Sequence, residues 1–213
     1  MNSKLKRDQL PPKKAENWRK SFKQEESLTF NLKVPKIILQ KETYKILTGE
    51  NENRVRVYLG LKPEKKEGKY ELCAYAVSAF LLGSGDVYAD YETPVFKLEK
   101  KNINCSDSTE KVIESIRLYR QWRNGELDGG SEGAMSRKYI YPNAYLLTKF
   151  ELHEIFVAQD KPEAQIEFGL EKTMNAMISP TVAETRAMDD EGEVFDFSTL
   201  CPPYCDERSI YNS

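Results

Sequence analysis

The sequence predicts an α+β fold of two tandem copies of one helix–strand–helix–strand–strand unit, with mainly antiparallel sheet, packed as a pseudo-dimer. Two segments carry similar patterns, VPKIILQKETYKILTGENENRVRVYLGL and YPNAYLLTKFELHEIFVAQDKPEAQIEFGL. Helices mixed with alternating strands favour an antiparallel sheet that is covered by helices on one face. Three landmarks recur at an offset of about 104 to 109 residues: Trp18-Arg19 and Trp122-Arg123, Pro35 and Pro142, and Gly60 and Gly169.

The duplication sets the predicted boundaries along the chain. A basic flexible arm covers residues 1–14, the first unit covers 15–105, and the second unit covers 106–200. A tail that contains the string CPPYC covers 201–213. Hydrophobic residues make up 39% of the 213 residues, which is enough for a packed core.

The first unit begins with a short helix over Ala15–Phe22, because Trp18 and Phe22 are four residues apart and share one helix face. Apolar and polar residues alternate over 28–34. That period of two predicts a half-buried strand, which Pro35 stops.

A second short helix is predicted over Gln40–Leu47, with Gly49 placed to close it. The next strand, RVRVYLGL, alternates. A charged loop leads from it to a strand over Tyr70–Val77, so we predict a hairpin. The buried side of RVRVYLGL would carry Val55, Val57, Leu59 and Leu61, and the exposed side Arg54, Arg56 and Tyr58.

The second unit repeats this order. Apolar residues at helical spacing predict a helix between the capping signal at Asp107–Glu110 and the stop signal Asn124-Gly125. A strand follows over 137–142, and then a helix that starts with the capping box of Thr148 and Glu151. The last strand would direct Ala164, Ile166, Phe168 and Leu170 inward, and Gln165 and Glu167 outward.

Charge is distributed unevenly along the chain. Residues 1–24 carry a net charge of +6, although the whole chain carries −2. A basic arm on an acidic body can bind a polyanion such as nucleic acid, or it can be a mobile terminus that leans on the acidic surface of its own body. The polyanion-binding candidates are Lys4, Lys6, Arg7, Lys13, Lys14, Arg19, Lys20 and Lys23.

The string Cys201-Pro-Pro-Tyr-Cys205 places two thiols four residues apart. One alternative is a zinc site that Cys105 helps to complete. The other is a rigid strap whose cysteines pack as small apolar residues, and we favour it because the spacing is not CxxC and no second closely spaced pair exists. Cys73 lies mid-strand and is expected in the core. No cofactor is therefore expected, and zinc is the alternative.

The chemistry of general acid–base catalysis has few candidates in this chain. His153 is the only histidine, and its helix lacks the HExxH zinc pattern because position 157 is Val. A lone histidine on a surface helix is most often an ordinary polar side chain facing solvent, so we expect a protein that is not an enzyme. The longest nearly apolar run, 73–82, falls short of the roughly 20 residues of a membrane span, and no secretory signal begins the chain. We expect a cytoplasmic protein.

The Trp18-Arg19 helix, Pro35, the Arg56–Leu61 strand and the Phe195–Asp206 ending together resemble a group of short, uncharacterised proteins of flavobacteria and related Bacteroidetes. Those proteins look like single units with a similar C-terminal CPPxCD tail. The resemblance implies the architecture and the localisation, and it carries over no catalytic residue. This chain departs from the group by having two units and a basic arm.

The function that we expect is a protein-interaction or scaffold module. The two halves would form two unequal faces, because Arg54 and Arg56 of the first strand correspond to Glu163 and Gln165 in the second unit. Polyanion binding through the arm and a thiol or zinc site at the CPPYC tail remain the alternatives. The expected partner is another protein, with nucleic acid as the alternative.

Overall fold

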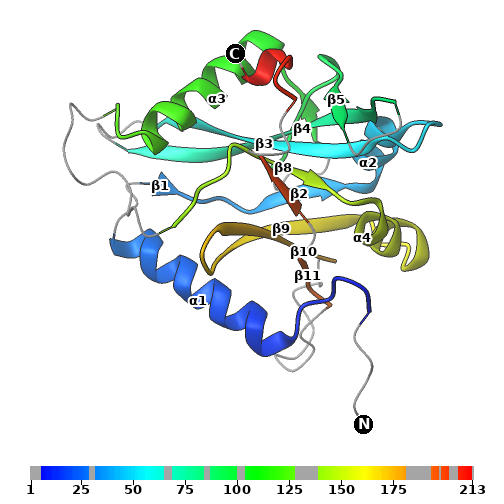
Figure 1. The fold of residues 1–213 in the computed structure, drawn as a ribbon, viewed down its shortest axis with the longest axis horizontal. Coiled ribbons are helices and arrows are strands. Elements are labelled where there is room, and N and C mark those ends of the chain that lie inside the picture. The colour runs from blue at the N-terminus through cyan, green and yellow to red at the C-terminus, as the bar shows by residue number, and fades with distance from the viewer. Residues whose placement is uncertain are drawn as a thin grey trace.

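The fold is α+β, as predicted, and its strands form two mostly antiparallel sheets. Figure 1 shows four layers, in which the two sheets lie face to face and one long helix covers each outer side. The computed structural model describes residues 6–28, 32–64, 69–83, 87–99, 104–127, 139–180, 193–196, 198–201 and 206–212.

The two longest helices cover the sheets, two shorter ones lie at one end of the sheets, and the short C-terminal helix lies beside α3. The helices of the described residues are α1 (Pro12–Leu28), α2 (Lys41–Thr48), α3 (Thr109–Arg123), α4 (Lys149–His153), the π-helix η1 (Glu154–Ala158) and the 3-10 helix η2 (Ile210–Asn212).

The larger sheet has the strand order β12–β8–β3–β4–β6–β7, and β1 and β5 also pair with β4. Only β1 runs parallel to its neighbour among these described pairs. Its strands are β1 (Leu32–Lys33), β3 (Arg54–Pro63), β4 (Tyr70–Leu81), β5 (Tyr88–Asp90), β6 (Phe96–Lys97), β7 (Cys105–Ser106), β8 (Ala144–Leu147) and β12 (Ser198–Cys201).

The smaller sheet has the order β11–β10–β9–β2, and all of its pairs are antiparallel. Its strands are β2 (Ile37–Gln40), β9 (Glu163–Leu170), β10 (Met174–Pro180) and β11 (Phe195–Asp196).

Each predicted unit contributes a strand to the sheet of the other. β2 comes from the first predicted unit and pairs with β9 of the second, whereas β8 of the second unit pairs with β3 of the first. The helices follow the same exchange, since α3 packs on β3 and α1 packs on β9. The predicted units 15–105 and 106–200 are therefore not separate bodies. The elements recur in the predicted order, but the tandem duplication itself stays a prediction.

Local chemistry explains where the helices begin and end. α1 extends beyond the predicted Ala15–Phe22 at both ends and starts at Pro12, whose missing N–H costs nothing in a first turn. α2 ends at Gly49, which has a φ of 54° and donates its backbone N–H to the Lys45 carbonyl. That stop was predicted, because glycine adopts this conformation without steric cost.

The two glycines of the repeat landmarks lie where helices approach the sheets most closely. A Cβ at Gly60 would lie 2.4 Å from the Ser115 Oγ of α3 and 2.8 Å from a ring carbon of Tyr75. A Cβ at Gly169 would lie 2.6 Å from the Trp18 Cβ of α1. Both strands therefore need a residue without a side chain at this position.

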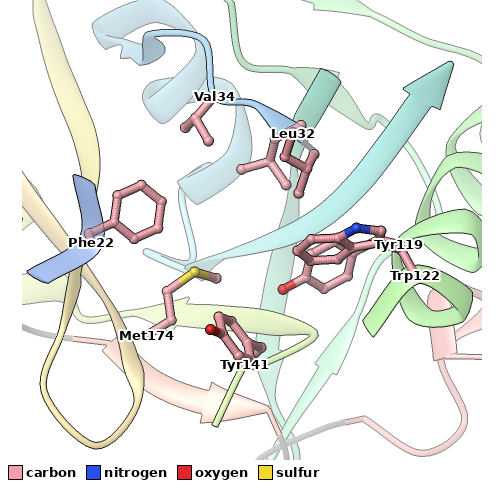
Figure 2. Close-up of a pocket in the computed structure, with 8 residues that line it drawn as sticks. Phe22, Leu32, Val34, Tyr119, Trp122, Tyr141 and Met174 are labelled. Atoms are coloured by element: carbon pink, nitrogen blue, oxygen red, sulfur yellow. The ribbon is translucent and has the colours of Figure 1, made fainter. Parts of the chain in front are cut away.

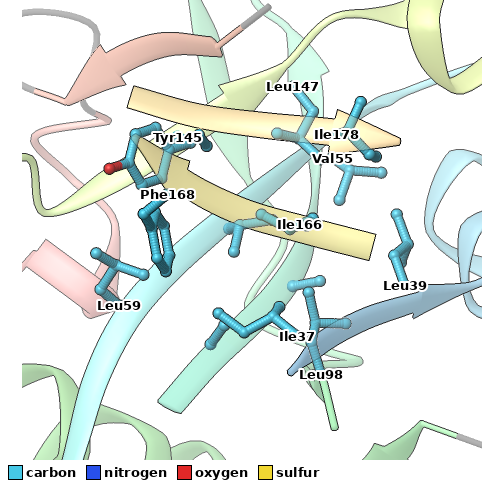
Figure 3. Close-up of a cluster of buried hydrophobic side chains, with 14 of the residues drawn as sticks. Ile37, Leu39, Val55, Leu59, Leu98, Tyr145, Leu147, Ile166, Phe168 and Ile178 are labelled. Carbon is cyan, nitrogen blue, oxygen red and sulfur yellow. The ribbon is translucent and has the colours of Figure 1, made fainter. Parts of the chain in front are cut away.

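The main core lies between the two sheets. Figure 3 shows Val55 and Leu59 of β3 meeting Ile166 and Phe168 of β9, with Leu39 of β2 beside them. All five side chains are buried. The inward positions of β9 agree with the predicted alternation, because that strand packs on one face against the larger sheet.

Two strands were missed from the sequence. β2 and β8 follow Pro35 and Pro142, whereas strands were predicted just before these prolines, over 28–34 and 137–142. In the described parts of those two predictions only β1 and a single bridge from Ile140 are found. All four residues of β2 and of β8 are buried, so neither strand shows the alternation that reveals a one-sided strand.

The prediction that Arg56 and Tyr58 lie on an exposed face of β3 is wrong. Arg56 is 1% exposed and Tyr58 is fully buried, because α3 and the C-terminal segment 206–212 cover this side of the strand. The predicted pair of unequal exposed faces therefore loses its support at Arg56.

Candidate functional site

The candidate site is an apolar pocket where both sheets and both long helices meet. The cavity itself has a volume of about 10 Å³, room for roughly one water molecule, at the base of an indentation of about 240 Å³ that includes open solvent. Figure 2 shows Phe22 on one side of this space, Tyr119 and Trp122 across from it, and Met174 and Tyr141 below. The described lining residues are Phe22, Leu32, Val34, Leu72, Tyr119, Trp122, Tyr141 and Met174.

Five helices and strands and two loops position these side chains. Phe22 comes from the third turn of α1 and Met174 from the start of β10, while Tyr119 and Trp122 lie one turn apart on α3 with their rings 5.8 Å apart. Only Leu32 and Val34 among the described lining residues are half-buried. The mouth of the pocket is therefore formed at β1, where the chain runs from α1 toward β2.

One hydroxyl of the pocket wall and a neighbouring arginine bind backbone carbonyls beside the pocket. The Tyr119 hydroxyl donates to the Pro142 carbonyl at 3.1 Å, and Arg123 Nη1 donates to the Tyr141 carbonyl at 3.2 Å. Burial raises the pKa of both tyrosine hydroxyls, so they stay protonated at neutral pH. Such groups can orient a ligand, but they do not supply a base.

Two carboxylates of α1 lie near the mouth. Glu25 raises the pKa of Tyr141 through its charge, and Glu26 accepts a hydrogen bond from the backbone of Val34. Burial raises the pKa of Glu26, while that hydrogen bond and the nearby Lys23 oppose the shift. With Arg123 also close, both signs of charge surround an apolar centre.

A second cluster of functional groups is enclosed. Arg56 and Asp90 form an ion pair at 3.2 Å with both side chains 1% exposed, and the Tyr58 hydroxyl donates to the Asp90 carboxylate. Burial raises the pKa of Asp90, and the Arg56 charge opposes this. In the described part of the chain, Arg56 Nε and Asp90 Oδ1 have no hydrogen-bond partner.

The C-terminal segment closes over this cluster. Asp206 Oδ2 accepts a hydrogen bond from the Asp90 backbone at 2.9 Å, and Asn212 donates to the Tyr58 hydroxyl at 3.3 Å. The Tyr211 ring packs 5.3 Å from the Tyr58 ring. The cluster contains a buried acid and a buried base, but the C-terminal segment encloses it. These contacts therefore anchor the C-terminal segment to β3 and β5.

Most described cations of the predicted polyanion site are already paired with carboxylates. Lys6 contacts Glu154 at 2.6 Å and Glu193 at 2.9 Å, and Arg19 contacts Glu167 at 2.9 Å. These contacts match the alternative in which the arm leans on its own acidic body. Of the other candidates, Arg7 pairs with Asp8, Lys20 pairs with Glu16, Lys14 lies over the Trp18 ring, Lys13 and Lys23 are exposed, and Lys4 lies outside the described residues.

Two of the three cysteines of the proposed zinc site, Cys105 and Cys201, lie far apart. Cys105 lies in β7 and Cys201 in β12, at opposite edges of the larger sheet. With strands about 4.8 Å apart, five steps across the sheet separate them by roughly 24 Å, so Cys105 cannot complete a site with Cys201. Cys205 lies outside the described residues, among which no three His, Cys, Asp or Glu side chains gather to hold a metal ion. Cys73 is buried, as predicted.

One unusual acid was not singled out from the sequence as a functional residue. Glu151 of α4 is completely buried, although its Thr148 partner was predicted as half of a capping box. Thr148 does not cap the backbone, because its hydroxyl contacts the Glu151 carboxyl instead. Nothing in the sequence shows that the N-terminal segment covers this acid. His153, two residues on, is exposed, as predicted for a surface histidine.

None of the helices in the described ranges is long and apolar enough to cross a membrane. No protein-family model, curated protein or solved structure matches this chain. The resemblance to the Bacteroidetes group therefore stays a prediction.

Proposed function

We propose that this protein is a non-enzymatic binding module whose pocket at the junction of the four layers accepts an apolar side chain of a partner protein. The observation that carries the proposal is the chemistry of the pocket. Its described walls are aliphatic, aromatic and thioether groups, and Met174 can adapt to the shape of an inserted group.

The energetics favour a protein partner over a small free ligand. Full burial of one Leu- or Phe-sized side chain stabilises a complex by about 1.5–3 kcal/mol. Alone, this corresponds to a Kd between roughly 6 and 80 mM. A stable complex therefore needs further contacts around the mouth, where Glu25, Glu26 and Arg123 supply groups that can pair with a polar rim.

The direct test uses free amino-acid probes. In a Trp18→Phe background, Trp122 is the remaining tryptophan, and its indole signal in NMR spectra reports on the pocket wall. We expect N-acetyl-leucinamide to shift this signal and N-acetyl-glutamamide to leave it unchanged, because only the first presents a sufficiently apolar side chain.

A pocket-filling variant with a matched control completes the design. Val34→Phe places a larger side chain at the mouth, whereas Val157→Phe makes the same change at a residue of η1 that is 53% exposed. We expect Val34→Phe to abolish the probe response, and Val157→Phe to retain it. An equal response in all three proteins, or no response in the parent protein, refutes the pocket as the binding site.

Partner capture then uses the same three proteins. A partner that binds through the pocket is retained by the parent and by Val157→Phe and is lost from Val34→Phe. A partner that all three proteins retain binds elsewhere and speaks against this proposal.

A further inference from the structure

The segment of residues 6–11, called the N-terminal strap below, is held against the smaller sheet. Leu10 donates its backbone N–H to the Val194 carbonyl at 2.7 Å, and the backbone N–H of Asp196 donates to the Asp8 carbonyl at 3.0 Å. A bridge between Gln9 and Phe195 lies between these bonds. The strap thus extends the sheet beyond its edge strand β11, and the prediction of a flexible arm does not describe residues 6–11.

The strap covers a small apolar cluster that is separate from the main core. Leu10 is only 6% exposed, and its side chain packs with Trp18 of α1, Met177 of β10 and Val194 beside β11. The cluster consists of Leu10, Ala15, Trp18, Met177 and Val194. Without Leu10, apolar surface of α1 and β10 would meet solvent.

A carboxyl group of the strap, that of Asp8, meets the buried carboxyl group of Glu151 beneath the strap. Glu151 has no solvent exposure, and its carboxyl lies within hydrogen-bonding reach of the Asp8 carboxyl. Two ionised carboxylates cannot hydrogen-bond to each other, because each only accepts. Thr148 contacts the Oε2 atom of Glu151, and the Oε1 atom is a buried oxygen for which no hydrogen bond is found among the described residues. The contact between Glu151 and Asp8 therefore requires a proton.

Other charges around the strap fall into two groups. Arg7 pairs with Asp8 at 3.3 Å and lies over the Phe150 ring, and Lys6 pairs with Glu154 and Glu193. Burial and the negative charges of Asp8 and Glu171 raise the pKa of Asp196, which Lys14 opposes. The groups that face the strap are therefore the acids Glu151, Glu154, Glu171, Glu193 and Asp196 and the base Lys14, against Lys6, Arg7 and Asp8 on the strap itself.

We propose that the N-terminal strap is a proton-dependent latch. With a proton shared between Glu151 and Asp8 the strap is closed over the apolar cluster. When that proton leaves, the buried Glu151 carboxylate is left charged beside the more exposed Asp8 carboxylate, and hydration of Glu151 together with repulsion by Asp8 opens the strap and exposes Trp18, Met177 and Val194 as an apolar surface.

The energetics place this change near neutral pH. Burial, and after it the neighbouring Asp8, raises the pKa of Glu151 from 4.5 to about 8, and the hydrogen bond from its own backbone and the charge of Arg7 offset only part of the shift. If opening restores the ordinary pKa, the opening equilibrium rises up to tenfold for each pH unit between these two values. The strap opens before the rest of the fold, because it is held by few backbone bonds and one apolar side chain.

The test is hydrogen exchange of the full chain, read at the Leu10 and Asp196 amides from about pH 5 to pH 9 and corrected for the intrinsic pH dependence of exchange. We expect the corrected opening equilibrium at both amides to rise with pH. Trp18 fluorescence in a Trp122→Phe background should shift toward that of an exposed indole over the same range.

Two variants separate the latch from general weakening. Glu151→Gln keeps the shape and donates to Asp8 without titrating, so it should keep the strap closed and remove the pH dependence. Glu154→Gln is the matched control, because it weakens the contact of the strap residue Lys6 with Glu154. Lys6 lowers the pKa of Glu154, so this carboxyl stays ionised over the whole pH range of the test. This variant should raise opening equally at every pH. A pH-independent opening in the unmodified protein, or an unchanged pH dependence in Glu151→Gln, overturns the proposal.

Discussion

The substitution Gly60→Ala tests the close approach between α3 and β3. The new Cβ would meet Ser115 Oγ at 2.4 Å, a Tyr75 ring carbon at 2.8 Å and the Ser115 backbone carbon at 3.1 Å. Real Cβ atoms essentially never make contacts as short as the first two, and the third, to the helix backbone, is tighter than most real Cβ contacts. Rotation of one side chain cannot relieve the crowding, so α3 must move away from the sheet.

The expected cost follows from packing and from two hydrogen bonds. Overpacking of a well-packed core costs about 1–3 kcal/mol. The shift also strains a chain of buried bonds, in which Tyr75 donates to Ser115 at 3.0 Å and Ser115 donates to the Leu61 carbonyl at 2.9 Å. Each contributes about 1 kcal/mol. We expect Gly60→Ala to lower the free energy of unfolding by roughly 3–4 kcal/mol.

Urea denaturation followed by tryptophan fluorescence and by circular dichroism measures this change. Gly49→Ala is the control, because Gly49 has positive φ but no atom within 4 Å, so it reports backbone strain of about 1 kcal/mol without crowding. Adding Ser115→Ala to Gly60→Ala should recover part of the loss. A loss below about 1 kcal/mol for Gly60→Ala, or a loss no larger than that of Gly49→Ala, refutes the close approach.

Three further predictions concern buried ionisable groups. The folded protein holds a proton on Glu151 that the unfolded chain releases, so the wild type loses stability as pH rises from about 4.5 to about 8. The stability advantage of Glu151→Gln in urea denaturation should grow over that range and then level off. Arg56→Met leaves Asp90 buried and unpaired, and should lower the free energy of unfolding by about 3–5 kcal/mol in the same assay; a loss under about 1 kcal/mol contradicts the buried pair. Burial raises the pKa of the Cys73 thiol, so an aromatic disulfide reagent should label exposed Cys105 at least about a hundredfold faster; equal rates contradict the burial.

Local sequence signals predicted several elements correctly, each for a local reason. Gly49 ends α2 because a left-handed residue is needed there, and α3 falls between the predicted start and stop signals. β9 alternates because only one of its faces packs on the larger sheet. Gly60 and Gly169 stand out in the sequence as repeat landmarks, but only the tertiary structure shows that a helix packs directly against each of them.

The candidate pocket could not be found in the same way. Its walls come from Phe22 of α1, Tyr119 and Trp122 of α3, and Met174 of β10, which are far apart in the chain. As buried apolar residues, they look like ordinary core positions when each is seen alone. The buried state of Arg56 has the same origin, because its partners Tyr88 and Asp90 come from β5, and no pattern within β3 records them.

The chain itself determined the α+β class, the helix ends and the one-sided strands, because these depend on the spacing of apolar residues and on the backbone preferences of glycine and proline. The tertiary structure decided which strands exchange between the halves, which charges become buried and where a carboxyl needs a proton. Glu151 shows the reason: its burial beneath Asp8 depends on a segment more than a hundred residues away, and desolvation depends on what covers a group and not on its neighbours in sequence.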